Sequence, residues 1–119
     1  MKTRKKTLQE HLDDFQTAVI GQREALLKGD WRTGNPLAKK YDAAFRKIIE
    51  YGEEGRNALL ALTEHPNVSV AEMAAVYSLK YNPEQCLNVL RRLSSEPGLI
   101  GFGAQQAIQR WEEGSWQLE

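Results

Sequence analysis

The pattern of apolar and polar positions predicts a helix at the centre of the chain. Residues 65–83 read HPNVSVAEMAAVYSLKYNP, so a proline turn, an apolar segment and a second proline turn follow one another. Ser69 and Glu72 form a capping box at the start of the expected helix. The main inward face consists of four residues at helical spacing: Val70, Met73, Ala74 and Tyr77. Val76 and Leu79 fall roughly opposite, so this helix either packs between neighbours or offers a docking face.

A first amphipathic helix is predicted over residues 8–28. Thr7 and Glu10 form a capping box at its start, and apolar residues at spacings of three, four and seven form one stripe. A loop over residues 29–34 follows and carries Trp31. Because a tryptophan can cover apolar surface at the end of a helical hairpin, we expect Trp31 to fold back onto the core. Contact with a partner is the alternative.

Two further helices precede the central segment. Asn35 supplies a cap and Pro36 a first helical residue for the second helix, which has the most regular amphipathic pattern in the chain. A glycine-containing turn at residues 52–55 ends it. A short third helix over residues 56–64 stops ahead of Pro66, because the residue before a proline is disfavoured in the helical conformation.

Two helices follow the central segment. Asn82 and Pro83 repeat the cap-plus-proline start of a helix that runs to Ser94, and Pro97 breaks the chain again. The last helix ends near Gly114. Its inward face consists of four residues spaced i, i+3, i+4, i+7: Ala104, Ala107, Ile108 and Trp111.

The chain contains a weak internal repeat. Pro66 and Pro97 lie 31 residues apart, and each stands in a turn between an apolar helix and a helix with small residues on its inner side. A period of this length is typical of stacked helical hairpins, each of which buries its apolar face against the next.

The segment HPNVSVAEMAAVYSL resembles a HEAT or armadillo-like hairpin, whose second helix carries small residues that let neighbours approach. More of the chain resembles a small uncharacterised bacterial helical-repeat family, a domain of unknown function. This resemblance rests on four segments: QREALLKGD (22–30), the helix starting at Asn35, the core over 59–75 and RWEEG (110–114). The resemblance implies an all-α fold of about six helices, with HEAT-like antiparallel hairpins stacked as a short α-solenoid. It carries over no catalytic residue. The fold class is similar to that of several toxin-immunity proteins.

Length and composition favour one domain. The chain has 119 residues and a mass of 13.5 kDa. We expect a flexible basic tail over 1–6, a single helical-repeat domain over 7–114 and a short C-terminal tail over 115–119. The single cysteine, Cys86, cannot form an internal disulfide, and 41% hydrophobic with 27% charged residues is typical of a soluble globular protein. A reducing, cytoplasmic location is therefore expected.

Charge is unevenly distributed along the chain. The first six residues carry four positive charges and no acid, which leaves 12 positive and 16 negative residues, a net charge of −4, over 7–119. An acidic body disfavours binding to nucleic acid. No stretch approaches the roughly 18 uninterrupted apolar residues of a membrane span, and the basic start leads into a charged helix. We therefore expect neither a nucleic-acid nor a membrane partner.

The residues that could carry chemistry are isolated from one another. Cys86, His11 and His65 lie far apart, which argues against a zinc site. Cys86 also occupies an inward helical position, where an inert neutral thiol is expected. Glu53 and Glu54 lie between two glycines, in a place that suits a solvated turn better than acid–base catalysis. We therefore expect no metal, no cofactor and no enzymatic activity.

These observations favour a non-enzymatic protein-binding module. The similarity of fold class to toxin-immunity proteins implies one specific role, that of an immunity protein that occludes a cognate toxin's active site. The expected binding face combines Glu72 and Leu79 on the central helix with Gln105 and Gln109 on the last, and Trp116 at its edge. Tail docking is the alternative for Trp116. A structural or self-associating domain, in which the same apolar surface closes a homodimer, is the alternative function, so a monomer and a homodimer both stay open.

Overall fold

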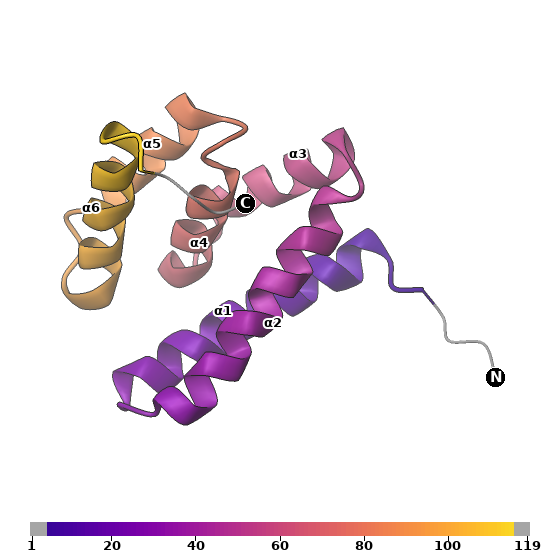
Figure 1. Ribbon diagram of the computed structural model, residues 1–119, viewed down its shortest axis with the longest axis horizontal. Coiled ribbons are helices and arrows are strands. Elements are labelled where there is room, and N and C mark those ends of the chain that lie inside the picture. Colours follow the sequence, from indigo (N-terminus) through magenta and orange to yellow (C-terminus); the bar gives the residue numbers. More distant parts are fainter. Residues whose placement is uncertain (1–4, 116–119) are drawn as a thin grey trace. The chain divides into compact units, whose positions relative to one another are not determined.

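A computed structural model describes residues 5–115, and all the regular secondary structure in that range is helical (Figure 1). The elements are α1 (Leu8–Leu27), α2 (Trp31–Ile49), α3 (Glu53–Ala61), the 3₁₀ helix η1 (Leu62–Glu64), α4 (Val68–Ser78), α5 (Pro83–Leu93) and α6 (Gly98–Glu112). The predicted all-α fold with about six helices is confirmed. The chain divides between Leu59 and Leu60 into two compact units. The single helical-repeat domain over 7–114 stays a prediction.

The first unit is built on the hairpin of α1 and α2, which run side by side in opposite directions (Figure 1). The ring of Phe15 meets that of Tyr41 edge-on, with centroids 6.1 Å apart and planes at 70°. Such aromatic pairs contribute roughly 0.5–1.5 kcal/mol beyond the area that they bury. The buried apolar residues of the two helices are Leu12, Phe15, Ala18, Val19, Ala25, Ala44, Phe45 and Ile48.

The start of α1 matches the capping box that the sequence predicts. The Glu10 N–H donates to the Thr7 hydroxyl oxygen at 3.2 Å, and the Thr7 N–H donates to the Glu10 carboxylate at 3.1 Å. Two backbone donors at this helix end are thereby satisfied by side chains.

The second helix begins one turn earlier than predicted. Asp30 is its cap, and its carboxylate accepts from the Thr33 N–H at 3.1 Å. Hydrogen bonds from the Thr33 side chain and then its backbone lower the pKa of Asp30 below the ordinary value. Pro36 therefore lies inside α2, and the predicted start at Asn35 is wrong. Trp31 is now the first helical residue and is 59% exposed, so the prediction that it folds back onto the core is also wrong.

The third helix also begins early. Gly52 has a φ of +66°, which reverses the chain directly after α2, and α3 starts at the next residue. A Cβ atom at Gly55 would overlap the Ile48 carbonyl oxygen, so the first turn of α3 approaches the end of α2 closely. Glu53 and Glu54 thus lie in a helical first turn, where acidic side chains favour the helix dipole. The helical stretch does end before Pro66, as predicted.

In the second unit, α4 packs against η1, α5 and α6. Its cap is Asn67, whose side chain accepts from the N–H groups of Ser69 at 2.9 Å and Val70 at 3.2 Å. The predicted capping box of Ser69 and Glu72 is therefore wrong, because an asparagine two residues earlier starts the helix first.

The core of the second unit lies between α4, α5 and α6. The small residues of α4 and α6 allow these helices to approach, as the sequence indicates. The cluster consists of Ala71, Ala75, Leu79, Cys86, Val89, Leu90, Leu93, Ala104 and Ala107. Ile108 and Trp111 pack against it and are partly buried, in agreement with the inward face predicted for the last helix. Gly114, with a φ of +74°, follows α6 and confirms the predicted end.

Candidate functional site

Leu79 does not lie on an open face. Its side chain is 0% exposed and belongs to the core of the second unit, together with Cys86 and Leu90 of α5. Its assignment to a binding face is therefore corrected. The second apolar side of α4 is real: α5 and α6 cover Leu79, whereas Val76 on the same side is only partly buried.

Glu72 is also buried, with 2% of its surface exposed. Its carboxylate lies against α6 at Gly103, where an added Cβ would stand 3.1 Å from the Glu72 Oε2 atom. A glycine at this position gives the carboxylate room to approach the α6 backbone. Glu72 cannot serve as an open contact residue in this structure, which corrects its predicted placement.

Gln105 and Gln109 lie exposed on α6, as the predicted face requires. The Gln105 amide donates to the Ser94 carbonyl oxygen at 2.9 Å, and the Gln109 amide donates to the Glu113 carboxylate at 2.9 Å. Trp116 lies outside the described residues. Partner binding by these three residues stays a prediction.

A groove runs along α6 beside the predicted face. Its volume is about 420 Å³, and we call it the α6 groove; its lining consists of Val76, Phe102, Gly103, Gln106, Ala107 and Arg110. Phe102 is 62% exposed, so a large aromatic side chain lies open to solvent at this groove. It lies off the inward stripe of α6, and that position was the sequence signal that the site prediction overlooked. On a helical wheel Phe102 falls between Gln109 and Gln106, so Gln109 of the predicted face borders the groove.

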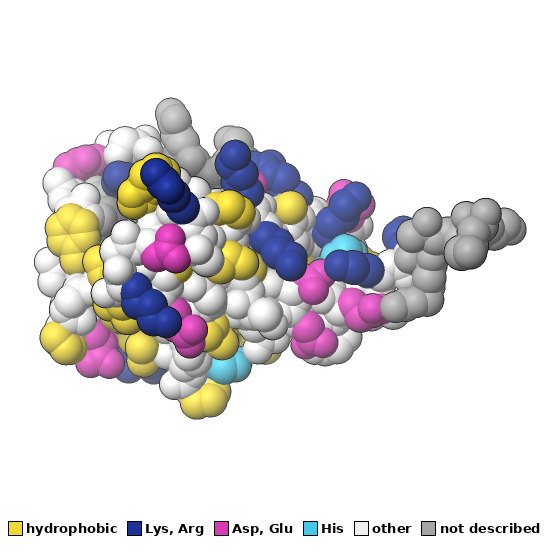
Figure 2. All heavy atoms as spheres, turned by 90° about the horizontal axis from the view of Figure 1, so that it is seen from below, with side chains coloured by type: hydrophobic (Ala, Val, Ile, Leu, Met, Phe, Trp, Pro, Cys, Tyr) yellow, Lys and Arg dark blue, Asp and Glu magenta, His cyan; other side chains and the backbone are white. Residues whose placement is uncertain are grey.

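A second apolar patch lies at the turn between α1 and α2. Leu26, Leu27 and Trp31 are 37%, 70% and 59% exposed. The Arg32 guanidinium carbon stands 5.5 Å from the Trp31 ring centroid, within cation–π range. On the face that Figure 2 presents, apolar side chains lie among both basic and acidic ones.

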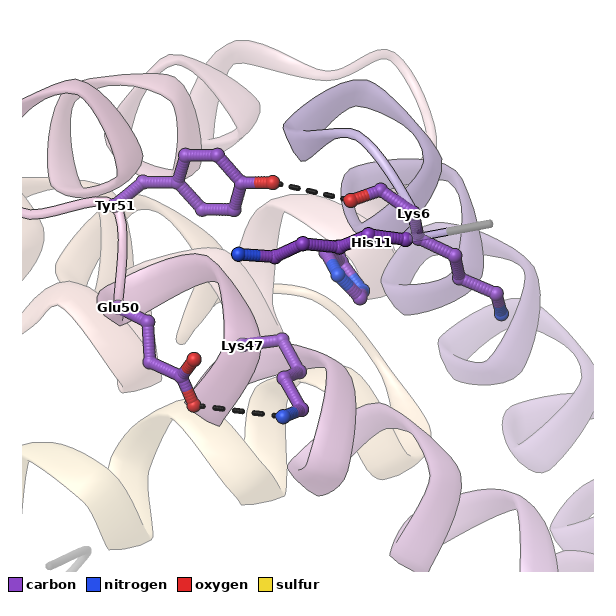
Figure 3. A pocket seen from close by; sticks show the side chains of 6 residues that line it. Lys6, His11, Lys47, Glu50 and Tyr51 are labelled. Carbon is purple, nitrogen blue, oxygen red and sulfur yellow. Dashed lines mark hydrogen bonds and ion pairs between the residues drawn. The ribbon is translucent and has the colours of Figure 1, made fainter. Parts of the chain in front are cut away.

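A basic pocket of about 320 Å³ lies in the first unit, where α1 begins and α2 ends. Figure 3 shows its lining residues, which come from the segment before α1, from α1 and from the end of α2. We call this set the basic pocket: Lys5, Lys6, His11, Lys47, Glu50 and Tyr51.

Three contacts shape the basic pocket. The Tyr51 hydroxyl donates to the Lys6 carbonyl oxygen at 3.1 Å, which ties the segment before α1 to the end of α2 (Figure 3). The His11 and Tyr51 rings stand 6.4 Å apart with an interplanar angle of 59°. The Lys47 ammonium lies 3.6 Å from the Glu50 carboxylate, and both side chains are exposed.

Cys86 and His65, the remaining residues that could carry chemistry, have structural roles. Burial raises the pKa of the Cys86 thiol to about 11, so the thiol is protonated and poorly nucleophilic at neutral pH. His65 accepts from the Asn67 N–H through Nδ1 at 2.9 Å and stabilises the turn before α4. Between residues 5 and 115, no three His, Cys, Asp or Glu side chains gather closely enough to hold a metal ion. No helix in that range is both long and apolar enough to span a membrane.

Comparison with known proteins supports the fold. No protein-family model matches the chain, and no curated protein matches it. The crystal structure of the protein RPA1889 from Rhodopseudomonas palustris CGA009 is similar, with a TM-score of 0.86 and 22% sequence identity over 98% of each chain. At this level of identity, the likeness extends to the helical fold of nearly the whole chain.

Proposed function

We propose that the protein is a non-enzymatic protein-binding module, and that it acts as an immunity protein that occludes the active site of a cognate bacterial toxin. The observation that carries this proposal is the exposure of Phe102, at 62%, in the α6 groove. Aromatic side chains, phenylalanine among them, are enriched in protein interfaces, and buried aromatic anchors carry much of the binding energy there.

The α6 groove has the layout of a small binding surface. Phe102 and Val76 supply apolar area, while Gln106 and Arg110 supply polar groups at its edge. Gln109 lies next to Phe102 on the helical wheel and is exposed, while Gln105 lies further round α6 and donates to the Ser94 carbonyl oxygen. Because these residues come from α6 and the packed helix α4, the surface is preformed, which reduces the entropy lost on binding.

Net charge supports a basic partner. Residues 7–119 carry a net charge of −4, so the body as a whole attracts a positively charged protein. Long-range attraction of this kind mainly raises the association rate and is weakened by salt. We therefore propose a basic toxin domain as the partner, with an apolar side chain that fits beside Phe102.

We propose further that α4 and α6 are the second helices of two HEAT-like hairpins in a short α-solenoid. The spacing of 31 residues between Pro66 and Pro97 supports this arrangement, since α4 and α6 follow these prolines and pack on each other. In such repeats, a row of equivalent helices forms the binding surface.

The product of a neighbouring toxin-like gene is the partner to test, by co-purification and calorimetry. We expect Phe102→Gln to weaken its binding at least about tenfold, as removal of an interface anchor typically does. The matched control is Leu27→Gln, which changes an exposed apolar residue at the α1–α2 turn and should leave the affinity unchanged. Both variants should keep the melting temperature of the parent protein.

Two results would count against the proposal. Failure to bind any toxin-like neighbour would remove the immunity role, and unchanged affinity of Phe102→Gln would remove the α6 groove as the site. Self-association is the competing function, because the exposed Phe102 could equally meet a second copy of the chain. Sedimentation at several concentrations separates the two, since a homodimer that Phe102→Gln dissociates would favour self-association.

A further inference from the structure

The basic pocket gathers positive charge where a helix begins. Lys5 and Lys6 directly precede α1, and Lys47 reaches the pocket from the last turn of α2. The carbonyl groups at the end of α2 attract a cation and account for Lys47. They do not account for Lys5 and Lys6, which come from the segment before α1, where the capping box already places the Glu10 carboxylate at the helix start. The positive charge that the pocket offers to an anion is therefore that of its lysine side chains.

The acidic neighbours leave much of this charge uncompensated. Asp14 pairs with Lys6, with 2.7 Å between carboxylate and ammonium. Glu50 lies 3.6 Å from Lys47, and the two side chains are 63% and 59% exposed, so this ion pair is weak and Lys47 can exchange it for another anion. Within residues 5–115, Lys5 has no carboxylate at ion-pair distance.

A hydrogen bond and two aromatic rings give the basic pocket a defined shape. The hydrogen bond from Tyr51 to the Lys6 carbonyl oxygen fixes the two lysines' backbone over the end of α2 (Figure 3). The His11 and Tyr51 rings, inclined at 59° to each other, line a partly apolar side of the cavity. A volume of about 320 Å³ lies at the lower end of the range for small-molecule sites, which is roughly 300–1,000 Å³.

We propose that the basic pocket binds the phosphate group of a small phosphorylated molecule. Lys5 and Lys47 contact the phosphate oxygens, and the His11 and Tyr51 rings contact the carbon part of the ligand. Lysine ammonium groups bind phosphate as point charges, without the fixed geometry that a guanidinium requires. The proposal concerns residues of the first unit and is independent of the α6 groove.

NMR titration of the full chain tests this proposal. Inorganic phosphate, ribose 5-phosphate and sodium chloride are added separately at constant pH and ionic strength, and the amide shifts of His11 and Tyr51 are followed. We expect saturable shifts with both phosphate compounds and none with chloride. Tighter binding of ribose 5-phosphate would support an organic phosphate as the ligand, and equal binding would restrict recognition to the phosphate group.

Variants locate the site. Lys5→Met and Lys47→Met should each weaken phosphate binding about fivefold, the upper range for one exposed charge pair. Lys40→Met removes a charge from an exposed position of α2 outside the pocket and should leave binding unchanged. Phe102→Gln should also leave it unchanged, which separates this proposal from the protein-binding role. Shifts that do not saturate, or an equal loss in Lys40→Met, would overturn the proposal in favour of general surface charge.

Discussion

Replacing Leu79 by alanine tests whether the end of α4 belongs to the core. Leu79 is 0% exposed and lies among Cys86, Leu90 and Ala104, which belong to α5 and α6. Shortening the side chain removes apolar contacts with two neighbouring helices and leaves a cavity. Buried Leu→Ala changes cost about 2–5 kcal/mol, and for this fully buried position we expect a loss of about 3 kcal/mol.

Urea unfolding followed by helical circular dichroism measures this loss. The midpoint of Leu79→Ala should fall, while the slope with denaturant stays that of the parent protein. Leu99→Ala is the matched control in the same unit, because Leu99 is 37% exposed and should lose less than about 1 kcal/mol. If Leu79→Ala is destabilised no more than Leu99→Ala at an unchanged slope, the placement of Leu79 in the core is refuted.

Three further predictions concern caps, close contacts and the buried thiol. Asn67→Ala should lower the free energy of unfolding by about 1 kcal/mol because Asn67 caps α4, whereas Asn82→Ala should cost less because its side chain makes no cap hydrogen bond; thermal unfolding compares them. Gly101→Ala should lower the melting temperature more than Gly103→Ala, because a Cβ overlaps backbone atoms at the first position and meets only a side chain at 3.1 Å at the second. Burial raises the pKa of Cys86 from 9.0 to about 11, so the folded protein keeps a thiol proton that the unfolded chain releases. The thiol's contribution to the free energy of unfolding is therefore fully present below pH 9 and is lost as the pH rises towards 11. Denaturant unfolding measured across this pH range should show a steeper fall in the free energy of unfolding for the parent protein than for Cys86→Ala.

The sequence predicts a helix boundary correctly where a single local signal marks it. The capping box of Thr7 and Glu10, the stop ahead of Pro66 and the start at Pro83 all appear in the structure as the sequence predicts. Each depends on hydrogen bonds or backbone restrictions within a few residues, so no distant contact is needed to decide it.

The sequence predicts the start of a helix wrongly where two residues close together can both cap it. Asp30 and Asn35 are both good caps one turn or so apart, and the structure uses the earlier one. Asn67 likewise precedes Ser69 and starts α4 first. Cap propensities differ by only tenths of a kcal/mol between such residues, so propensity alone does not decide which of two neighbouring caps starts the helix.

The sequence by itself determined that this protein is helical, roughly how many helices it has and which positions face inward, because helical periodicity and capping are local properties. Only the tertiary structure decided which neighbour covers each face. It buried Leu79 and Glu72, left Phe102 exposed, and joined Lys6 to Tyr51, 45 residues later in the chain, to form the basic pocket. A helical wheel shows which side chains share a face, but burial depends on the helices that pack there, and that packing is set by contacts between residues far apart in the sequence.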